Sequence, residues 1–407
     1  MNKAGKVEKA GKSLCPACRS RPDNYYQGDI MGSTIRACAA ALLLAAASCA
    51  ASAEEGVTDN TILIGQTIGL TGQIAGPVKE MTGGAHAYIA AVNREGGVNG
   101  RRIEIRTLDD RFDPKLSAVN AETLVRKAHV FAMFQNRGTP HTQAILPILT
   151  ANRVPLVAPS TGAAIFHNPV NHLIFNVRAK YQAEVVKTVE HFTTVGFKRI
   201  GMIHVDDTFG KDALQGFERA MAERKLKPAA IISFNRARPD IDAAAVAAIQ
   251  ATPDAVLIIG SATSTVALIK AIRKRGNQMQ IMTLSNNSSQ AFVRSLGKDG
   301  YGIIVSQVSP APDLVTTRLG QEFQEDAKVT GATVSYAAME GFISAKVLVE
   351  GLRRAGRHLT REGFIKALES IHGEDLGGVM IGYSEDDHTG SEFVEMTMIG
   401  RDGRFVR

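Results

Sequence analysis

The sequence predicts a two-lobed α/β protein, and three observations support this class. From Thr61 onward, short β-branched or apolar runs alternate with longer amphipathic segments, as in parallel strands joined by helices. The 354 residues after Ala53 exceed the roughly 250–300 residues that one hydrophobic core usually serves, so we expect two domains. After Ala53 there is no short repeat and no low-complexity linker, which two interleaved lobes with several chain crossings would explain.

The elements follow from this alternation in order along the chain. We expect strands at 62–67, 102–108, 130–135, 154–158, 199–205, 230–234, 255–259 and 280–284. We expect helices at 78–93, 114–127, 142–151, 183–194, 213–223, 241–250, 266–275, 315–328, 336–354 and 361–370. Segments 175–178 and 305–312 interrupt the pattern and are candidate crossings between lobes. A terminal hairpin is predicted from 378–383 and 393–399, with its turn at 385–390.

The first 53 residues read as targeting sequence. Residues 31–53 form a secretion signal, with Arg36, an apolar run at 37–47 and small residues before a cleavage site after Ala53, which predicts a periplasmic protein. The apolar run is 11 residues long, against about 20 for a membrane-spanning helix. Cys49 offers an alternative as a lipoprotein cysteine. A second methionine at Met31 indicates that residues 1–30 are an upstream extension from a misassigned start codon.

Composition excludes several classes. All four cysteines, at 15, 18, 38 and 49, precede Ala53, so the mature chain uses neither disulfides nor thiol catalysis, and the CxxC at 15–18 lacks the two further ligands of a zinc site. Residues 54–407 hold 40 basic and 37 acidic residues, a balance that gives no indication of nucleic-acid binding. Motifs of metalloproteases, serine hydrolases, P-loop proteins and EF-hands are absent. We therefore expect no enzyme, no metal and no cofactor.

Short stretches at strand ends and glycine turns resemble one family. They are 64–66 with 70–72, 91–93 with 96–100, 109–114, 155–160, 204–210 and 336–346. Together and in this order, they are similar to the periplasmic branched-chain amino-acid-binding (Leu/Ile/Val-binding) family, the substrate-binding components of ABC importers. The resemblance covers nearly all of residues 57–400 and implies the type I periplasmic binding fold: two doubly wound parallel-sheet lobes joined by a hinge with about three crossovers. Lobe 1 would hold 57–177 and about 310–375, and lobe 2 would hold 178–309 and about 376–407.

The resemblance also implies a ligand site. In the family, hydroxyls and backbone N–H groups in two loops of the first lobe hold the ligand carboxylate, and the matching positions here are Gly138, Thr139, Ser160, Thr161 and Gly162. Thr139 and Ser160 would alternatively serve only as helix caps. The family often has Ser-Ala-Thr where this chain has Ser160-Thr161-Gly162, which leaves open which hydroxyl reaches the ligand.

The second lobe departs from the family at a charged position. The resemblance assigns an aromatic contact to Phe209 and a polar contact to Ser261, with Tyr181 and Tyr336 as candidates for the cleft rim. It places Ser285 where amino-acid binders carry an acidic residue that pairs with the ligand ammonium. An ammonium buried without a counter-charge costs several kcal/mol. Either Asp206 or Asp207 substitutes, or the ligand is a non-amino carboxylate or an amide-like molecule.

The predicted function is that of a periplasmic solute-binding protein. It would act as a monomer, capture a small amino acid or related carboxylate by lobe closure, and deliver it to the membrane subunits of an ABC importer. An alternative is an extracytoplasmic sensor for an amide or aromatic acid. An NAD-type α/β enzyme is disfavoured, because the glycines at 69, 72 and 76 do not match GxGxxG, and Asp109 and Asp110 come too late for the ribose contact.

Overall fold

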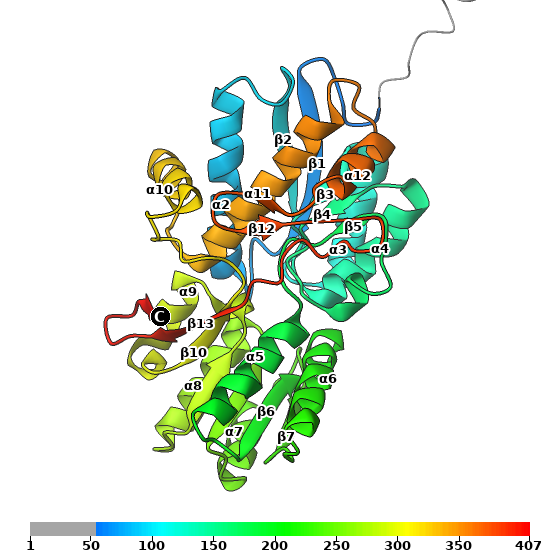
Figure 1. The fold of residues 1–407 in the computed structure, drawn as a ribbon. Coiled ribbons are helices and arrows are strands. Elements are labelled where there is room, and N and C mark those ends of the chain that lie inside the picture. The colour runs from blue at the N-terminus through cyan, green and yellow to red at the C-terminus, as the bar shows by residue number, and fades with distance from the viewer. Residues whose placement is uncertain (1–53) are drawn as a thin grey trace, which may run out of the picture. The chain divides into compact units, whose positions relative to one another are not determined.

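The computed structural model describes residues 54–407. The expected extension, secretion signal, cleavage site, CxxC and lipid-bearing Cys49 lie outside these residues. Within them, the predicted α/β class is confirmed: two mostly parallel sheets are covered by helices (Figure 1). None of the helices in residues 54–407 combines the length and apolar character needed to cross a bilayer.

The first lobe is built on a five-stranded parallel sheet in the order β2-β1-β3-β4-β5. Its strands are β1 (Thr61–Ile68), β2 (Arg102–Asp109), β3 (Ala132–Phe134), β4 (Leu156–Val157) and β5 (Ile174–Phe175). Its helices are α2 (Ala75–Arg94), α3 (Pro114–Glu122), α4 (Thr139–Asn152), α10 (Arg318–Thr330), α11 (Tyr336–Ala355) and α12 (Arg361–Glu369), with the π-helical turn η1 (Thr123–Lys127) and the 3-10 turn η2 (Ala164–Phe166).

Side-chain alternation divides this lobe into two apolar layers. Ile62 and Ile64 of β1 pack with α2, α10, α11 and α12, whereas Leu63 between them packs with α3 and α4 on the other face. The strand order explains the division. The chain moves from β1 to β2 in one direction across the sheet, and from β2 past β1 to β3 in the opposite direction. Because both crossovers are right-handed, α2 and α3 lie on opposite faces of the sheet.

The second lobe repeats this topology in a seven-stranded sheet, β14-β13-β10-β9-β8-β6-β7. Its strands are β6 (Ile200–Val205), β7 (Ile231–Phe234), β8 (Ala255–Ile259), β9 (Gln280–Thr283), β10 (Ile304–Gln307), β13 (Glu395–Ile399) and β14 (Phe405–Val406). Its helices are α5 (Tyr181–Thr194), α6 (Thr208–Glu223), α7 (Ile241–Gln250), α8 (Ala262–Lys274) and α9 (Gln290–Leu296), with the 3-10 turns η3 (Ser285–Asn287) and η4 (Gly297–Gly300).

The chain passes between the two sheets three times: after β5, after β10 and before β13. The chain returns to the second lobe later than the predicted boundary at about 376. Residues beyond that boundary still pack in the core of the first lobe, namely Leu376, Val379, Ile381 and Tyr383. The predicted terminal hairpin is also wrong. Strand β12 (Met380–Ile381) pairs with β11 (Glu374–Asp375), while β13 pairs with β10 and β14. In Figure 1 the red strand β13 accordingly lies beside the yellow-green β10.

Helices α2 and α11 are about 250 residues apart in sequence, yet their backbones are in contact. Figure 1 shows the orange α11 against the blue α2. Two glycines allow this approach. A Cβ on Gly84 would lie 1.8 Å from the Ala338 carbonyl oxygen, and one on Gly341 would lie 1.9 Å from the Met81 carbonyl oxygen. No side chain fits at either position, so these glycines set the position of α11 against α2.

Candidate functional site

The candidate site lies where the strand order of each sheet reverses. In an open parallel sheet, the strands on either side of that point lead to helices on opposite faces, which leaves a crevice at the carboxyl ends of the strands. In the first lobe this point falls between β1 and β3, and in the second between β6 and β8. Loops that follow these strands and their neighbours supply the residues of one cavity.

That cavity encloses about 410 Å³ of empty space, including its open mouth, and both lobes line it. The lining residues share a position just after a strand or at the start of a helix. From the first lobe they are Ile74, Phe112, Arg137, Gly138, Thr139 and Ser160, and from the second they are Tyr181, Phe209, Arg236, Ser261, Ala262 and Asn286.

The first-lobe loops bring Gly138, Thr139 and Ser160 to the cavity wall. Gly138 is the residue before α4 and has φ = 103°, and a Cβ there would lie 2.6 Å from Nδ1 of His141. The Thr139 hydroxyl is 2.8 Å from the Thr161 hydroxyl, and Ser160 Oγ donates to Glu340 Oε1 at 3.2 Å. Neither hydroxyl caps a helix, so the capping alternative does not describe this structure.

Four predicted residues do not line the cavity. Thr161 is fully buried behind Thr139, and a Cβ on Gly162 would lie 2.6 Å from the Ala179 carbonyl oxygen. Ser285 is 2% exposed, accepts a hydrogen bond from Arg178 and donates its N–H to Glu184 Oε2 at 2.9 Å. Its neighbour Asn286 reaches the cavity instead. Tyr336, a candidate for the rim, packs against Phe405 and lines a different hollow.

Two aromatic residues of the second lobe form an apolar wall. Tyr181, the first residue of α5, and Phe209, in the first turn of α6, have ring centroids 4.6 Å apart. Both are almost fully buried, so each belongs to the core and also faces the cavity. Desolvation raises the pKa of Tyr181, so its hydroxyl stays protonated at neutral pH. Ser261 caps α8 through the Ser264 N–H and lines the same side.

Neither aspartate proposed as a substitute for the missing acid is available to a ligand. Asp207 caps α6 and forms an ion pair with Arg236, with Oδ2 2.5 Å from Nη2. Asp206 is half-exposed, pairs with Lys211 at 3.1 Å and does not line the cavity. The cavity therefore has no carboxylate in its lining.

The residues that sequence reasoning missed are mainly two arginines, Arg137 and Arg236. Each follows a predicted strand by two residues, the position where ligand contacts gather in such sheets, and that was the available signal. Phe112 joins them: its ring lies 5.0 Å from the Arg236 guanidinium and stacks on His141 with centroids 4.4 Å apart. Burial lowers the pKa of His141 to about 4, so His141 is neutral. The cavity is thus lined by two cations and several apolar groups.

A buried polar network lies behind the cavity where the chain first crosses between lobes. Arg178 forms an ion pair with Glu184 of α5 and lies 3.8 Å from Glu340 of α11. Glu184 also accepts hydrogen bonds from the Ser285 N–H and, at 2.5 Å, from the Ser306 hydroxyl. Burial alone would lower the pKa of Arg178, but the nearby carboxylates outweigh it and hold the pKa above its ordinary value.

Hydrogen bonds also join the lobes around the cavity. Arg137 Nη2 donates to the Asn286 carbonyl at 2.7 Å, and Thr263 Oγ1 donates to the Gln73 carbonyl at 2.7 Å. Glu80 of α2 accepts from the N–H groups of Gln290 and Ala291 at the start of α9, both at 2.8 Å. These contacts join the first lobe directly to the second, so the structure holds the two lobes in a closed arrangement.

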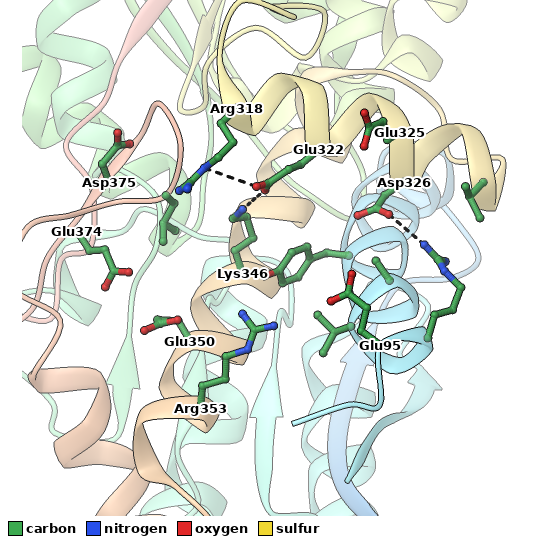
Figure 2. A pocket seen from close by; sticks show the side chains of 16 residues that line it. Glu95, Arg318, Glu322, Glu325, Asp326, Lys346, Glu350, Arg353, Glu374 and Asp375 are labelled. Carbon is green, nitrogen blue, oxygen red and sulfur yellow. Dashed lines mark hydrogen bonds and ion pairs between the residues drawn. The ribbon is translucent and has the colours of Figure 1, made fainter. Parts of the chain in front are cut away.

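A larger groove lies away from the cleft. Figure 2 shows that charged side chains of α10 and α11 line it, among them Glu322, which pairs with Arg318 and Lys346. All of its residues come from the first lobe, and several of its charges pair with one another, such as Arg94 with Asp326. The smaller cavity between the lobes is the better ligand site, since it combines buried hydroxyls, two guanidinium groups and apolar walls from both lobes.

Two lobes of this topology with a cavity between their strand ends define a two-lobed binding protein. The family model described as "Periplasmic binding protein" matches residues 61–404, and the chain belongs to this family. The chain is 21% identical over 312 residues to the Leu/Ile/Val-binding protein homolog 3 of Brucella melitensis, which covers 75% of this chain and 83% of that one. It is 22% identical over 325 residues to the leucine-, isoleucine-, valine-, threonine-, and alanine-binding protein of Pseudomonas aeruginosa, with 71% and 78% covered.

The solved structures agree with this family. A substrate-binding periplasmic protein from Ralstonia solanacearum superposes with a TM-score of 0.80 at 28% identity, covering 85% of this chain and 99% of that one. The predicted resemblance to the Leu/Ile/Val-binding type is therefore confirmed. The family and fold are those of binding proteins rather than enzymes, and the family implies a periplasmic location.

Proposed function

We propose that this protein captures a small organic solute, an amino acid or a related carboxylate, between its lobes and delivers it to the membrane subunits of an ABC importer. One observation carries the proposal: both lobes line one cavity at their strand ends, and hydrogen bonds join the two lobes. A ligand in this position would contact both lobes at once, so its binding favours closure.

The names of the relatives support the solute class. The Brucella and Pseudomonas proteins are named for binding branched-chain and small amino acids, and the matched region spans most of both chains. The backbone and hydroxyl groups of Gly138, Thr139 and Ser160 sit beside the start of α4, where unpaired N–H groups and the helix dipole favour an anion. A carboxylate is the group that such a loop would hold.

A thermal-shift screen tests the proposal. The mature protein, unfolded and refolded to remove retained ligand, is melted with branched-chain amino acids, aromatic carboxylates, short amides and dinucleotides. A ligand at about 100 times its Kd adds about 2.7 kcal/mol to the free energy of unfolding, which shifts the melting temperature measurably. Stabilisation by an organic acid or amino acid supports solute capture. A response to dinucleotides alone would contradict it.

Delivery to an importer needs a separate experiment. We propose that the 31–53 segment exports the chain and is removed after Ala53, so the mature receptor works free in the periplasm. N-terminal sequencing of the exported protein checks this cleavage. Deletion of the gene should abolish uptake of the radiolabelled ligand that the screen identifies. Unchanged uptake in the deletion strain would contradict the delivery role while leaving ligand binding intact.

A further inference from the structure

Arg137 is a buried cation at the cavity wall. It is 7% exposed, follows β3 and lines the cavity beside Gly138 and Thr139. In residues 54–407, no carboxylate oxygen lies within 4.0 Å of its guanidinium nitrogens. Two of its hydrogen bonds go to the Asn286 carbonyl and the Met81 sulfur. A guanidinium carries five N–H donors, so most of them have no partner in the described part of the chain.

A buried guanidinium without a counter-ion is unfavourable unless an anion joins it. Desolvation accordingly lowers the pKa of Arg137, although a guanidinium stays charged at neutral pH. The carboxylates nearby do not contact it: Glu340 attracts Arg137 only from beyond ion-pair distance and accepts from Ser160, and Asp207 is paired with Arg236. The missing negative charge is therefore expected from the ligand. A carboxylate matches the planar fork of a guanidinium with two parallel hydrogen bonds.

The rest of the lining argues against an ammonium on that ligand. The cavity has no carboxylate in its lining, and the carboxylate beside its second guanidinium, Asp207, is already paired with Arg236, so no lining residue supplies a counter-charge to an ammonium. The Asn286 side-chain oxygen is buried without a hydrogen-bond partner among residues 54–407, but a neutral acceptor does not replace a counter-charge. Apart from Gly138 and the hydroxyl-bearing residues Thr139, Ser160 and Ser261, the remaining surface is apolar or aromatic and is supplied by Ile74, Phe112, Tyr181, Phe209 and Ala262.

We infer that the natural ligand is an ammonium-free carboxylate with an apolar or aromatic body, and that Arg137 is the residue that selects its carboxylate. The inference rests on the proposed function of solute capture and names its ligand class. It assigns a specificity role to a residue outside the hydroxyl-bearing positions. Arg137 also donates to Asn286 across the cleft, so the same side chain couples carboxylate binding to contact between the lobes.

Two matched ligand series test the inference by isothermal titration calorimetry on refolded mature protein. One is 4-methylpentanoate, leucine and 4-methylpentanamide, and the other is 3-phenylpropanoate, phenylalanine and 3-phenylpropanamide. In at least one series the plain acid should bind about 10- to 100-fold more tightly than the amino acid and the amide, the factor expected for a charge-assisted hydrogen bond. An amino acid that binds as tightly as its acid would overturn the inference and leave solute capture standing.

Arg137→Gln separates a specificity role from a merely structural one. It should bring the affinities of acid and amide to within about threefold of each other, whereas a structural role would weaken both equally. Arg137→Lys keeps the charge and should retain the preference for the acid, which decides the question even where Arg137→Gln does not fold. The exposed Arg126→Gln is the control and should keep the wild-type ratio.

The failure of the inference and that of the proposed function are distinguishable. An acid-to-amide ratio that persists in folded Arg137→Gln, or the failure of both plain acids to bind, overturns the ligand class. Solute capture itself is refuted only where no amino acid, acid or amide in the wider thermal-shift screen stabilises the protein.

Discussion

Glu80 should control ligand affinity without touching the ligand. It lies on α2 of the first lobe, is 4% exposed, and its two carboxylate oxygens accept from the N–H groups of Gln290 and Ala291 at the start of α9 in the second lobe. Glu80→Gln preserves the shape but replaces one acceptor oxygen by a donor that faces an N–H group. The closed arrangement would lose one charge-assisted bond, worth about 1.5–3 kcal/mol.

The loss appears in the dissociation constant because binding and closure are coupled. Where the unliganded protein is mostly open, a closed state destabilised by this amount raises Kd about 10- to 100-fold. Calorimetry with the ligand from the screen measures the change, and Glu325→Gln, an exposed carboxylate on α10, is the matched control. A Kd for Glu80→Gln within about twofold of wild type would refute the reasoning.

Three further changes test the fold behind the site. Glu184→Gln should lower the free energy of unfolding by about 3–5 kcal/mol in a urea titration, because Arg178 loses its buried counter-charge; a loss under about 1 kcal/mol would contradict this. Burial raises the pKa of the Asp110 carboxyl from 3.8 to about 6, so the folded state holds the carboxyl proton more tightly than the unfolded state does. The free energy of unfolding should therefore fall, by up to about 3 kcal/mol, as pH rises from 3.8 to about 6. Asp110→Asn should flatten the dependence of melting temperature on pH between 4 and 7. Gly84→Ala should lower the free energy of unfolding by at least about 1–3 kcal/mol, because the added methyl group forces α2 and α11 apart. Gly83→Ala is the control and should stabilise the protein slightly, because the nearest atom to its Cβ would lie 3.9 Å away. Equal effects of the two changes in thermal melts would show that the close approach of the helices is unimportant.

The sequence was informative where structure depends on local pattern. Parallel strands such as β6 and β8 are buried on both faces and read as apolar runs, and the helices between them show clear periodicity, so both kinds of element were predictable. The C-terminal segment was not. Strands β11 and β12 are two residues each, and Leu376 and Ile381 are buried by packing on the first lobe, which no local pattern encodes.

The site was predictable in position but not in charge. The loops around Thr139, Ser160 and Phe209 were assigned through the family resemblance, and they line the cavity at the strand ends, where parallel sheets present ligand contacts. After β9 the predicted ligand contact is shifted by one residue. The predicted Ser285 contacts Arg178, and the next residue, Asn286, lines the cavity. Arg137 was missed because an arginine after a strand faces solvent as readily as a cleft, and its contacts with Met81 of the first lobe and Asn286 of the second are far from it in sequence.

The central claim is that a ligand closes the two lobes over the cavity, and an interlobe distance tests it most directly. Residues 54–407 contain no cysteine, so Lys115→Cys and Arg238→Cys can carry spin labels without competing thiols. Both positions are exposed, one on each lobe, close to the Phe112–Arg236 contact at the cleft. Double electron–electron resonance should show a longer or broader distance distribution in refolded, ligand-free protein and a single shorter distance at saturating ligand. A distribution that does not change on saturation would contradict the claim.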